Sequence, residues 1–554
     1  MKAGKGPGKK LKGWEVRFLR AISLIFDSLF ICIFIILARI MRLFFAVALM
    51  LCHIGGRAQH YSGAIDIVDA LDRAFAGNGG VEFDGLRIQF DKLNGKGISG
   101  FLAARYPNQV NPAGQVVVPS PIAFNNCFFE KSLDFEKIVF NDLSITGCVV
   151  GNQHFSGTQF QSLTLQGNTV ENSIELSGTQ AAALAIRENT VGYEIFLDHD
   201  SIVGDTFIES NQLHAGEIIV SSGYFNGSVT VGNNQVTGIL IEKSYFEFPE
   251  YGEFNNYKLT DNASSDLYLT ANHFIGDGTN KVYFNKGNYL NLDIRDNEFG
   301  VNVYFIENKA EERFFLVGNE FKKHVSFEKF LFSETWNELY WKQLEGYKLR
   351  YAEYGGETRA ELDDEVKYSN LINIYKGLHT IFLSRGDIES ANACYSEMKQ
   401  LQGRRLKLIF QEDRSFSNFL RWQLNVLLKV YTNHGTDPAL AVVMSFFVIL
   451  IFAFLYLFFP SEWDSDSMNR LLISYERFLQ RKKKANVAPL LVVFGSVLLS
   501  LINSITLSIN SFVTLGFGSI PTKGFARYLC IVEGFIGWFL LSIFTVALIN
   551  QVLA

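Results

Sequence analysis

Residues 163–170 read Leu-Thr-Leu-Gln-Gly-Asn-Thr-Val, and residues 184–191 read Leu-Ala-Ile-Arg-Glu-Asn-Thr-Val. Both stretches fit the motif apolar-x-apolar-x-x-Asn-x-apolar, which recurs through the middle of the chain. Because apolar residues alternate within each copy, the motif predicts short strands with one buried face. The asparagines of its seven copies are Asn168, Asn189, Asn211, Asn234, Asn272, Asn297 and Asn319.

A second apolar pair follows each of the first four asparagines, as in Ile174-x-Leu176. From Asn168 to Asn234 the asparagine steps by 21, 22 and 23 residues, so each repeat supplies two short strands. Coils of this length stack into a parallel β-helix, with equivalent residues about 4.8 Å apart. We therefore predict a parallel β-helix of about nine coils over residues 59–335. The asparagines would form a structural ladder that satisfies backbone groups at a turn.

Two upstream copies of the motif have cysteine in place of asparagine, at Cys127 and Cys148. Their spacing, 148 − 127 = 21 residues, puts the two sulfur atoms on neighbouring coils. Two interpretations are open. The pair is either a disulfide in an exported domain or two small buried residues that continue the ladder.

The start of the predicted β-helix has a pattern of its own. From Ile65 to Ile88 it is similar to the capping helix and first strand of bacterial pentapeptide-like β-helix proteins. That resemblance implies a helix that closes the unpaired edge of the first coil.

Catalysis is one alternative, because some parallel β-helices cleave pectin with carboxylates or a cation site on one face. The best candidates here are Asp198, His199 and Asp200, with Asp293 and Asp296. They fall on different coils, which favours solvated surface residues. The six cysteines form no Cys-x-x-Cys pair and the nine histidines no His-Glu-x-x-His motif. We therefore expect no enzyme activity, no cofactor and no resident metal.

The N-terminal segment predicts export of the β-helix. The first twenty residues carry seven basic side chains and one acid, so this end is expected in the cytoplasm. The apolar run from Leu19 to Ile54 is interrupted by charges, and residues 41–58 have the three-part build of a secretory signal peptide. Residues 1–58 are then a signal peptide or a membrane anchor. A buried amphipathic hairpin, which leaves the β-helix in the cytoplasm, is the alternative.

From about Trp336 the apolar period changes from 2 to 3.6, which predicts a helical connector over residues 336–435. The stripe from Tyr368 to Leu378, the turn at Gly386 and the small Ala391 resemble a helical hairpin of tetratricopeptide type. One hairpin is too little for a solenoid, so its expected task is to join the β-helix to the membrane.

Apolar tracts near the C-terminus predict membrane helices. One crosses at residues 436–460, and a polar loop over 461–484 ends in the basic run Arg481-Lys-Lys-Lys484. Apolar character resumes from Ala488 and again from Tyr528. If both basic regions are cytoplasmic, the β-helix lies outside and the third crossing brings Thr514 to the outer face.

Residues 511–521 read Ser-Phe-Val-Thr-Leu-Gly-Phe-Gly-Ser-Ile-Pro, with an apolar helix on either side. This segment resembles the two-helix pore domain of potassium channels, whose filter reads Thr-x-Gly-Tyr-Gly-Asp, and the resemblance covers residues 485–554. It implies an outer helix, a pore helix, a filter at 514–518 and an inner helix at 525–552. In such filters, backbone carbonyls of four subunits recoordinate a dehydrated cation. The implied filter residues are Thr514, Leu515, Gly516, Phe517 and Gly518.

The segment departs from the family pattern at two positions. Phe517 replaces the tyrosine and Ser519 the aspartate that braces the filter, and both changes bear on potassium selectivity. In the stretch that resembles the inner helix, Gly534 or Gly537 is either a hinge or a close packing point. Glu533 is an ionisable group in an apolar helix, which marks it as a functional candidate, unless it lies at the outer interface.

The leading expectation is a cation channel, conducting potassium, in a bacterial inner membrane, with the β-helix as a sensory or anchoring domain. Its partners are the lipid bilayer, three further copies in a homotetramer and an unidentified ligand or protein on the β-helix or hairpin. A net charge of −6 argues against nucleic acid. The rival expectation is a membrane-anchored β-helix scaffold or receptor whose pore-like end serves oligomerisation only.

Overall fold

The computed structural model describes residues 61–553 except 78, 215, 248–255, 277–279, 352–357, 460–471, 474–475, 477–487, 515–521 and 523. These residues form a parallel β-solenoid of about 12 turns, followed by helices. The predicted parallel β-helix is confirmed, but the number of about nine coils is wrong, because further coils have other residues at their corners and lack the asparagine motif. The described chain forms two compact units, residues 61–224 with 233–240, and residues 225–232 with 241–553.

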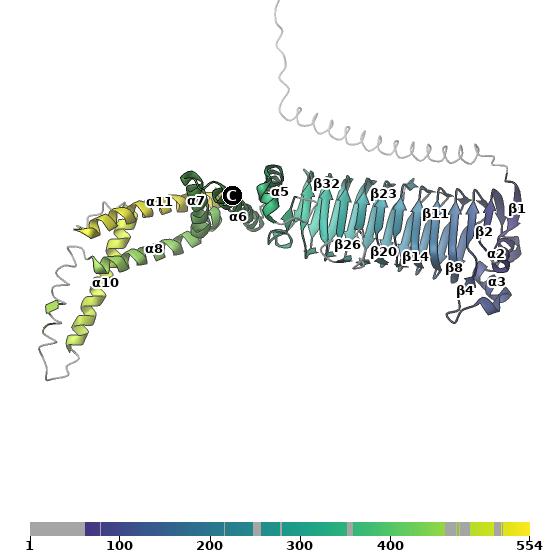
Figure 1. Ribbon diagram of the computed structural model, residues 1–554, viewed down its shortest axis with the longest axis horizontal. Coiled ribbons are helices and arrows are strands. Elements are labelled where there is room, and N and C mark those ends of the chain that lie inside the picture. Colours follow the sequence, from purple (N-terminus) through teal and green to yellow (C-terminus); the bar gives the residue numbers. More distant parts are fainter. Residues whose placement is uncertain are drawn as a thin grey trace, which may run out of the picture. The chain divides into compact units, whose positions relative to one another are not determined.

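The solenoid strands stack coil on coil in parallel (Figure 1). They are β1 (Gly63–Asp66), β2 (Val81–Asp84), β3 (Leu86–Gln89), β4 (Val116–Val118), β5 (Ile122–Asn125), β6 (Phe128–Phe129), β7 (Leu133–Glu136), β8 (Ile138–Thr146), β9 (Val149–Val150), β10 (Gln153–Ser156), β11 (Gln159–Gln166), β12 (Thr169–Val170), β13 (Ile174–Ser177), β14 (Gln180–Arg187), β15 (Thr190–Val191), β16 (Ile195–Asp198), β17 (Ser201–Ile202), β18 (Thr206–Glu209), β19 (Gln212–Leu213), β20 (Glu217–Ser221), β21 (Tyr224–Asn226), β22 (Val229–Gly232), β23 (Gln235–Glu242), β24 (Tyr245–Glu247), β25 (Asn256–Thr260), β26 (Ala263–Thr270), β27 (His273–Ile275), β28 (Lys281–Asn285), β29 (Asn288–Arg295), β30 (Glu298–Phe299), β31 (Asn302–Ile306), β32 (Lys309–Val317), β33 (Glu320–Phe321), β34 (Val325–Glu328), β35 (Trp336–Leu339) and β36 (Leu349–Arg350).

A helix closes the first coil, as the sequence predicts. α2 (Ile67–Ala76) begins at the N-cap Asp66, whose side chain accepts a hydrogen bond of 3.0 Å from the backbone N–H of Val68. Its buried side packs against β2 and β4. A second short helix, α3 (Ile98–Arg105), packs against β4 and β7 and has no counterpart in the prediction.

Equivalent residues of successive repeats lie directly opposite one another. β11 pairs with β14 so that Leu163 faces Leu184 and Leu165 faces Ile186. All four of these side chains are buried. The alternation of apolar and polar residues therefore builds the solenoid core as the sequence predicts.

Each coil turns a corner through a left-handed residue just before the ladder position, such as Gly167 with φ 63° and Glu188 with φ 57°. The Asn189 side chain then accepts a hydrogen bond of 3.0 Å from Asn168 N and donates one of 2.9 Å to Leu165 O. One carboxamide thus satisfies two backbone groups of the previous coil, which the sharp bend leaves without strand partners.

The seven asparagines belong to two corners and not to one, which corrects the predicted single ladder. In one sheet, Asn168, Asn189, Asn211 and Asn234 follow β11, β14, β18 and β22; in the other, Asn272, Asn297 and Asn319 follow β26, β29 and β32. The corner of the second sheet is left-handed in the same way, as at His199 with φ 56°. Because both corners need the same hydrogen bonds, the motif does not distinguish them.

The second unit stacks aromatic rings along its core. Phe246, Phe274, Phe299 and Phe321 follow one another at ring-centroid distances of 4.8, 4.9 and 5.0 Å. The solenoid continues through β36, which pairs with β34, so its predicted end at residue 335 is wrong. The helical connector predicted from about Trp336 starts too early, because the described α-helices after the solenoid begin with α4 (Thr358–Asp363).

Helices fill the rest of the second unit. They are α4 (Thr358–Asp363), α5 (Glu365–Ser384), α6 (Ile388–Glu412), α7 (Phe416–Thr432), α8 (Pro438–Phe458), α10 (Ala488–Thr514) and α11 (Phe525–Leu553). α5 and α6 form the predicted hairpin, with Gly386 at φ 72° in the turn and Ala391 fully buried.

The ladder position of Asp200 generates a prediction. Asp200 is 2% exposed, and its Oδ1 accepts a hydrogen bond of 2.6 Å from Thr179 N. Burial raises the pKa of this carboxyl to about 7. Because the folded state binds the proton more tightly than the unfolded chain, stability falls as pH rises from about 4 to about 7. Asp200→Asn removes that cost and replaces Oδ2, a buried atom without a hydrogen-bond partner, by an N–H donor.

We expect Asp200→Asn to stabilise the full chain at pH 8 by an amount on the order of 3 kcal/mol, seen as a higher thermal unfolding midpoint by circular dichroism. The gain should vanish near pH 4. The reciprocal variant Asn189→Asp, in the other ladder, should lower the midpoint at pH 8. Equal midpoints for wild type and Asp200→Asn across this range would contradict the ladder role.

Candidate functional site in the membrane helices

Three described helices are long and apolar enough to cross a membrane. Their spans are Pro438–Phe458, Val497–Thr514 and Phe525–Ile549, with mean hydropathies of 2.9, 1.6 and 2.1. Large apolar side chains such as Phe446, Phe454 and Phe535 are exposed on their surfaces. An exposed apolar surface of this kind is favourable in contact with lipid, and its exposure to water costs free energy.

The three helices converge on Glu533 of α11, which is fully buried. Tyr456 of α8 donates a hydrogen bond of 2.7 Å to its Oε2, and Ser508 of α10 donates one to its Oε1. A carboxyl group in an apolar bundle needs such donors, because water cannot solvate it there. Glu533 therefore lies inside the helix bundle, between α8 and α10.

A line of small hydroxyl residues runs along the buried face of α10. Ser504, Ser508 and Ser511 are spaced by four and three residues, so they lie on one side of the helix. All three are buried, and Ser511 Oγ donates a hydrogen bond of 2.7 Å to Cys530 O of α11. We call these three residues the serine stripe. It gives the bundle interior oxygen ligands and donors next to Glu533.

α10 and α11 approach closely at a glycine. A Cβ atom added to Gly537 would lie 2.2 Å from the carbonyl oxygen of Phe512, so no larger residue fits without movement of the backbone. Gly534, one turn earlier, is also buried. The sequence predicts that these glycines act either as a hinge or as a close packing point. The geometry at Gly537 is that of a close packing point.

The predicted filter falls almost wholly outside the described residues. Thr514 ends α10, and its Oγ1 bonds to the carbonyl oxygen of Asn510 in the same helix at 2.5 Å. Leu515, Gly516, Phe517 and Gly518 are not among the described residues, nor are residues 1–60 and the basic run 481–484. α10 is continuous from Ala488, so it has no break between the predicted outer helix and pore helix.

The acidic residues weighed for catalysis do not gather. His199 pairs with Asp198 at 2.9 Å on the surface, Asp200 is a ladder residue, and Asp293 pairs with Arg295 at 2.5 Å. Asp296 occupies a left-handed corner position with φ 54°. In the part of the chain that the structure describes, no group of three or more His, Cys, Asp or Glu side chains is arranged to hold a metal.

The two cysteines of the first ladder are free thiols, so the disulfide interpretation is wrong in this structure. Cys127 N donates a hydrogen bond of 3.3 Å to the sulfur of Cys148, and Cys148 N donates one of 2.9 Å to Asn168 Oδ1. The sulfur thus stands where the asparagine oxygen stands in later coils.

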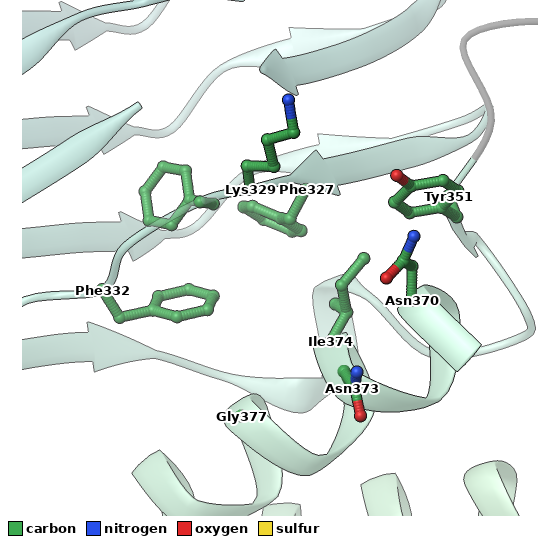
Figure 2. Close-up of a pocket in the computed structure, with 9 residues that line it drawn as sticks. Phe327, Lys329, Phe332, Tyr351, Asn370, Asn373, Ile374 and Gly377 are labelled. Carbon is green, nitrogen blue, oxygen red and sulfur yellow. The ribbon is translucent and has the colours of Figure 1, made fainter. Parts of the chain in front are cut away.

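A pocket of about 330 Å³ lies where the last coils meet α5. Figure 2 shows Ile374 and Asn370 of α5 on one side and Phe327 and Tyr351 of the solenoid on the other. Lys329 at its rim is paired with Glu307 at 2.6 Å. The pocket therefore combines aromatic walls with amide groups, and the charge of its lysine is paired with the carboxylate of Glu307.

Sequence reasoning identified Glu533 but missed its partners. The serine stripe could have been predicted from the sequence, because the spacing of its residues by four and three follows the helical period within an apolar segment. Tyr456 could not, since its role depends on how α8 packs against α11. In comparisons with protein-family models, curated proteins and solved structures, nothing matches this chain.

The contact at Gly537 predicts a packing defect on substitution. Gly537→Ala should destabilise the detergent-solubilised protein by about 1–3 kcal/mol and lower its thermal unfolding midpoint, because the added methyl group meets a backbone carbonyl. The matched control is Gly495→Ala in α10, where a Cβ meets nothing within 4 Å. A midpoint for Gly537→Ala as high as that of the control would contradict the packing role and favour a hinge.

Proposed function

We propose that this protein is a membrane channel for monovalent cations, with potassium as the expected ion, and that its β-solenoid is a sensory or anchoring domain. The observation that carries the proposal is the run Thr514 to Gly518 between two membrane-length helices. Glycines at its third and fifth positions permit successive carbonyls to point toward one axis, as a dehydrated cation requires.

The bundle chemistry supports the same proposal. Glu533 and the serine stripe place oxygen atoms and one ionisable group in the interior, beside the helix that leads into Thr514. Ionisable groups inside membrane helices are costly to bury, and those that are present commonly mark ion or proton pathways. One chain supplies one filter strand, so conduction requires a homotetramer.

The link between solenoid and membrane helices supports a sensory role. Glu397 of α6 is buried, and its carboxylate accepts hydrogen bonds from Gly346 N at 2.9 Å and Tyr347 N at 3.0 Å, beyond the last long strands. Tyr375 of α5 donates a third of 2.7 Å. Burial raises the pKa of Tyr375, so it remains a donor. One side chain thus clamps the solenoid end to both helices of the hairpin.

We propose that the protein lies in a bacterial inner membrane with the solenoid outside. This topology places the basic N-terminus and the basic run at 481–484 in the cytoplasm, as the positive-inside rule requires. The continuous α10 is long enough to be a complete crossing in this topology. A second candidate function, a membrane-anchored scaffold or receptor, is favoured by the same continuity, because a chain without a separate pore helix lacks one element of the resembled pore.

The two candidates predict different ion flux. Purified full-length protein in liposomes should conduct potassium, and Gly516→Ala should reduce the flux by at least about tenfold while the tetramer persists, because a Cβ obstructs the carbonyl orientation. Flux is measured with a potassium-gradient fluorescence assay, and oligomeric state by light scattering. Gly495→Ala, on the exposed face of α10, is the control and should conduct like wild type.

A folded wild-type tetramer with no more flux than empty liposomes would contradict the channel and favour the scaffold. Equal flux from Gly516→Ala and wild type would show that ions do not pass the proposed filter.

A further inference from the structure

One face of α7 is covered by the neighbouring helix. Phe410 of α6 packs against Phe419 and Trp422 of α7, each at a ring-centroid distance of 5.6 Å. Two turns away on α6, Gly403 approaches Asn425 so closely that an added Cβ would lie 2.1 Å from Asn425 Oδ1. The residues at 419, 422 and 425 therefore mark the protein-facing side of α7.

The opposite face of α7 is apolar and exposed. Phe416, Leu420 and Leu424 repeat at a spacing of four residues and are 74%, 43% and 47% exposed. The same face continues to Leu427 and Tyr431, which pack in the cluster formed with the membrane helices. The exposed apolar face is therefore continuous with the surface of the segments that are long enough to cross a membrane.

The charge of this region is one-sided. From Arg414 to Thr436 the sequence contains three basic residues, Arg414, Arg421 and Lys429, and no acidic residue. Arg421 lies beside the apolar face, so its long side chain can reach along the edge of that face, whereas Lys429 lies nine residues from Leu420 and therefore on the opposite side of α7. An apolar face with a basic residue at its edge is typical of a helix that lies in the plane of an anionic membrane surface.

We propose that α7 is an interfacial helix. Its residues Phe416, Leu420 and Leu424 insert into the boundary between headgroups and acyl chains, and Arg421 binds the phosphate groups of anionic lipids. The occupant of this face is the bilayer into which α8 is inserted, just beyond η4 (Asn433–Gly435). The inference rests on membrane insertion of the helices and is independent of ion conduction.

Site-specific photo-crosslinking tests this placement in the full chain with its native cysteines. A benzoylphenylalanine at position 420 is irradiated in vesicles of phosphatidylcholine and phosphatidylglycerol at 3:1, and adducts are identified by mass spectrometry. Phe446, exposed on α8, is the lipid-facing control, and Leu331, exposed on the solenoid, is the water-facing control.

We expect lipid adducts at positions 420 and 446 and none at 331. Phosphatidylglycerol should be enriched more than about twofold at position 420 over its share of the vesicle, because each basic residue near the surface attracts anionic lipid. Arg421→Gln should remove the enrichment, whereas Lys429→Gln, on the opposite side of α7, should leave it unchanged. A crosslink to a second copy, or no adduct at 420 while 446 reacts, would overturn the interfacial placement. Lipid adducts without enrichment would overturn the anionic preference.

Discussion

The structure depends on one constraint, which is that a polar backbone group removed from water must have a hydrogen-bond partner. A solenoid meets this constraint along its strands by pairing coil with coil, but each corner interrupts the pairing. The asparagine carboxamide restores it, as where Asn211 accepts from Asn189 N at 3.1 Å and donates to Ile186 O at 2.8 Å. The left-handed residue before it is costly for any residue except glycine, and the ladder offsets that cost at every coil.

The same constraint governs the helical end of the molecule. Glu397 satisfies two backbone N–H groups in the last coil, just before β36. In the membrane helices the roles are reversed, because the buried group is Glu533 and its partners are hydroxyls from two other helices. Both carboxyl groups join elements that are distant in sequence. A change at either site therefore reaches several elements at once.

The solenoid was predictable because its hydrogen-bond constraint repeats at a regular spacing, which leaves the asparagine pattern in the sequence. The assignment of Asn272 to the other corner was not predictable, since the two corners have identical requirements. The continuity of α10 was hidden because serine and asparagine residues lower its local hydropathy without breaking a helix. Glu533 was detectable as a charge in an apolar segment, but its contact with Tyr456 depends on tertiary packing alone.

The proposed topology requires that the helices cross a membrane and separate the solenoid from the segment between α8 and α10. Single cysteines at Val203, which is 63% exposed on the solenoid, and at Ser474 in that segment test it directly in a chain without native cysteines. On intact cells, an impermeant thiol reagent should label the cysteine at 203 at once and the one at 474 only after the membrane is opened. Labelling of both positions on intact cells, or of 474 alone, would contradict this arrangement.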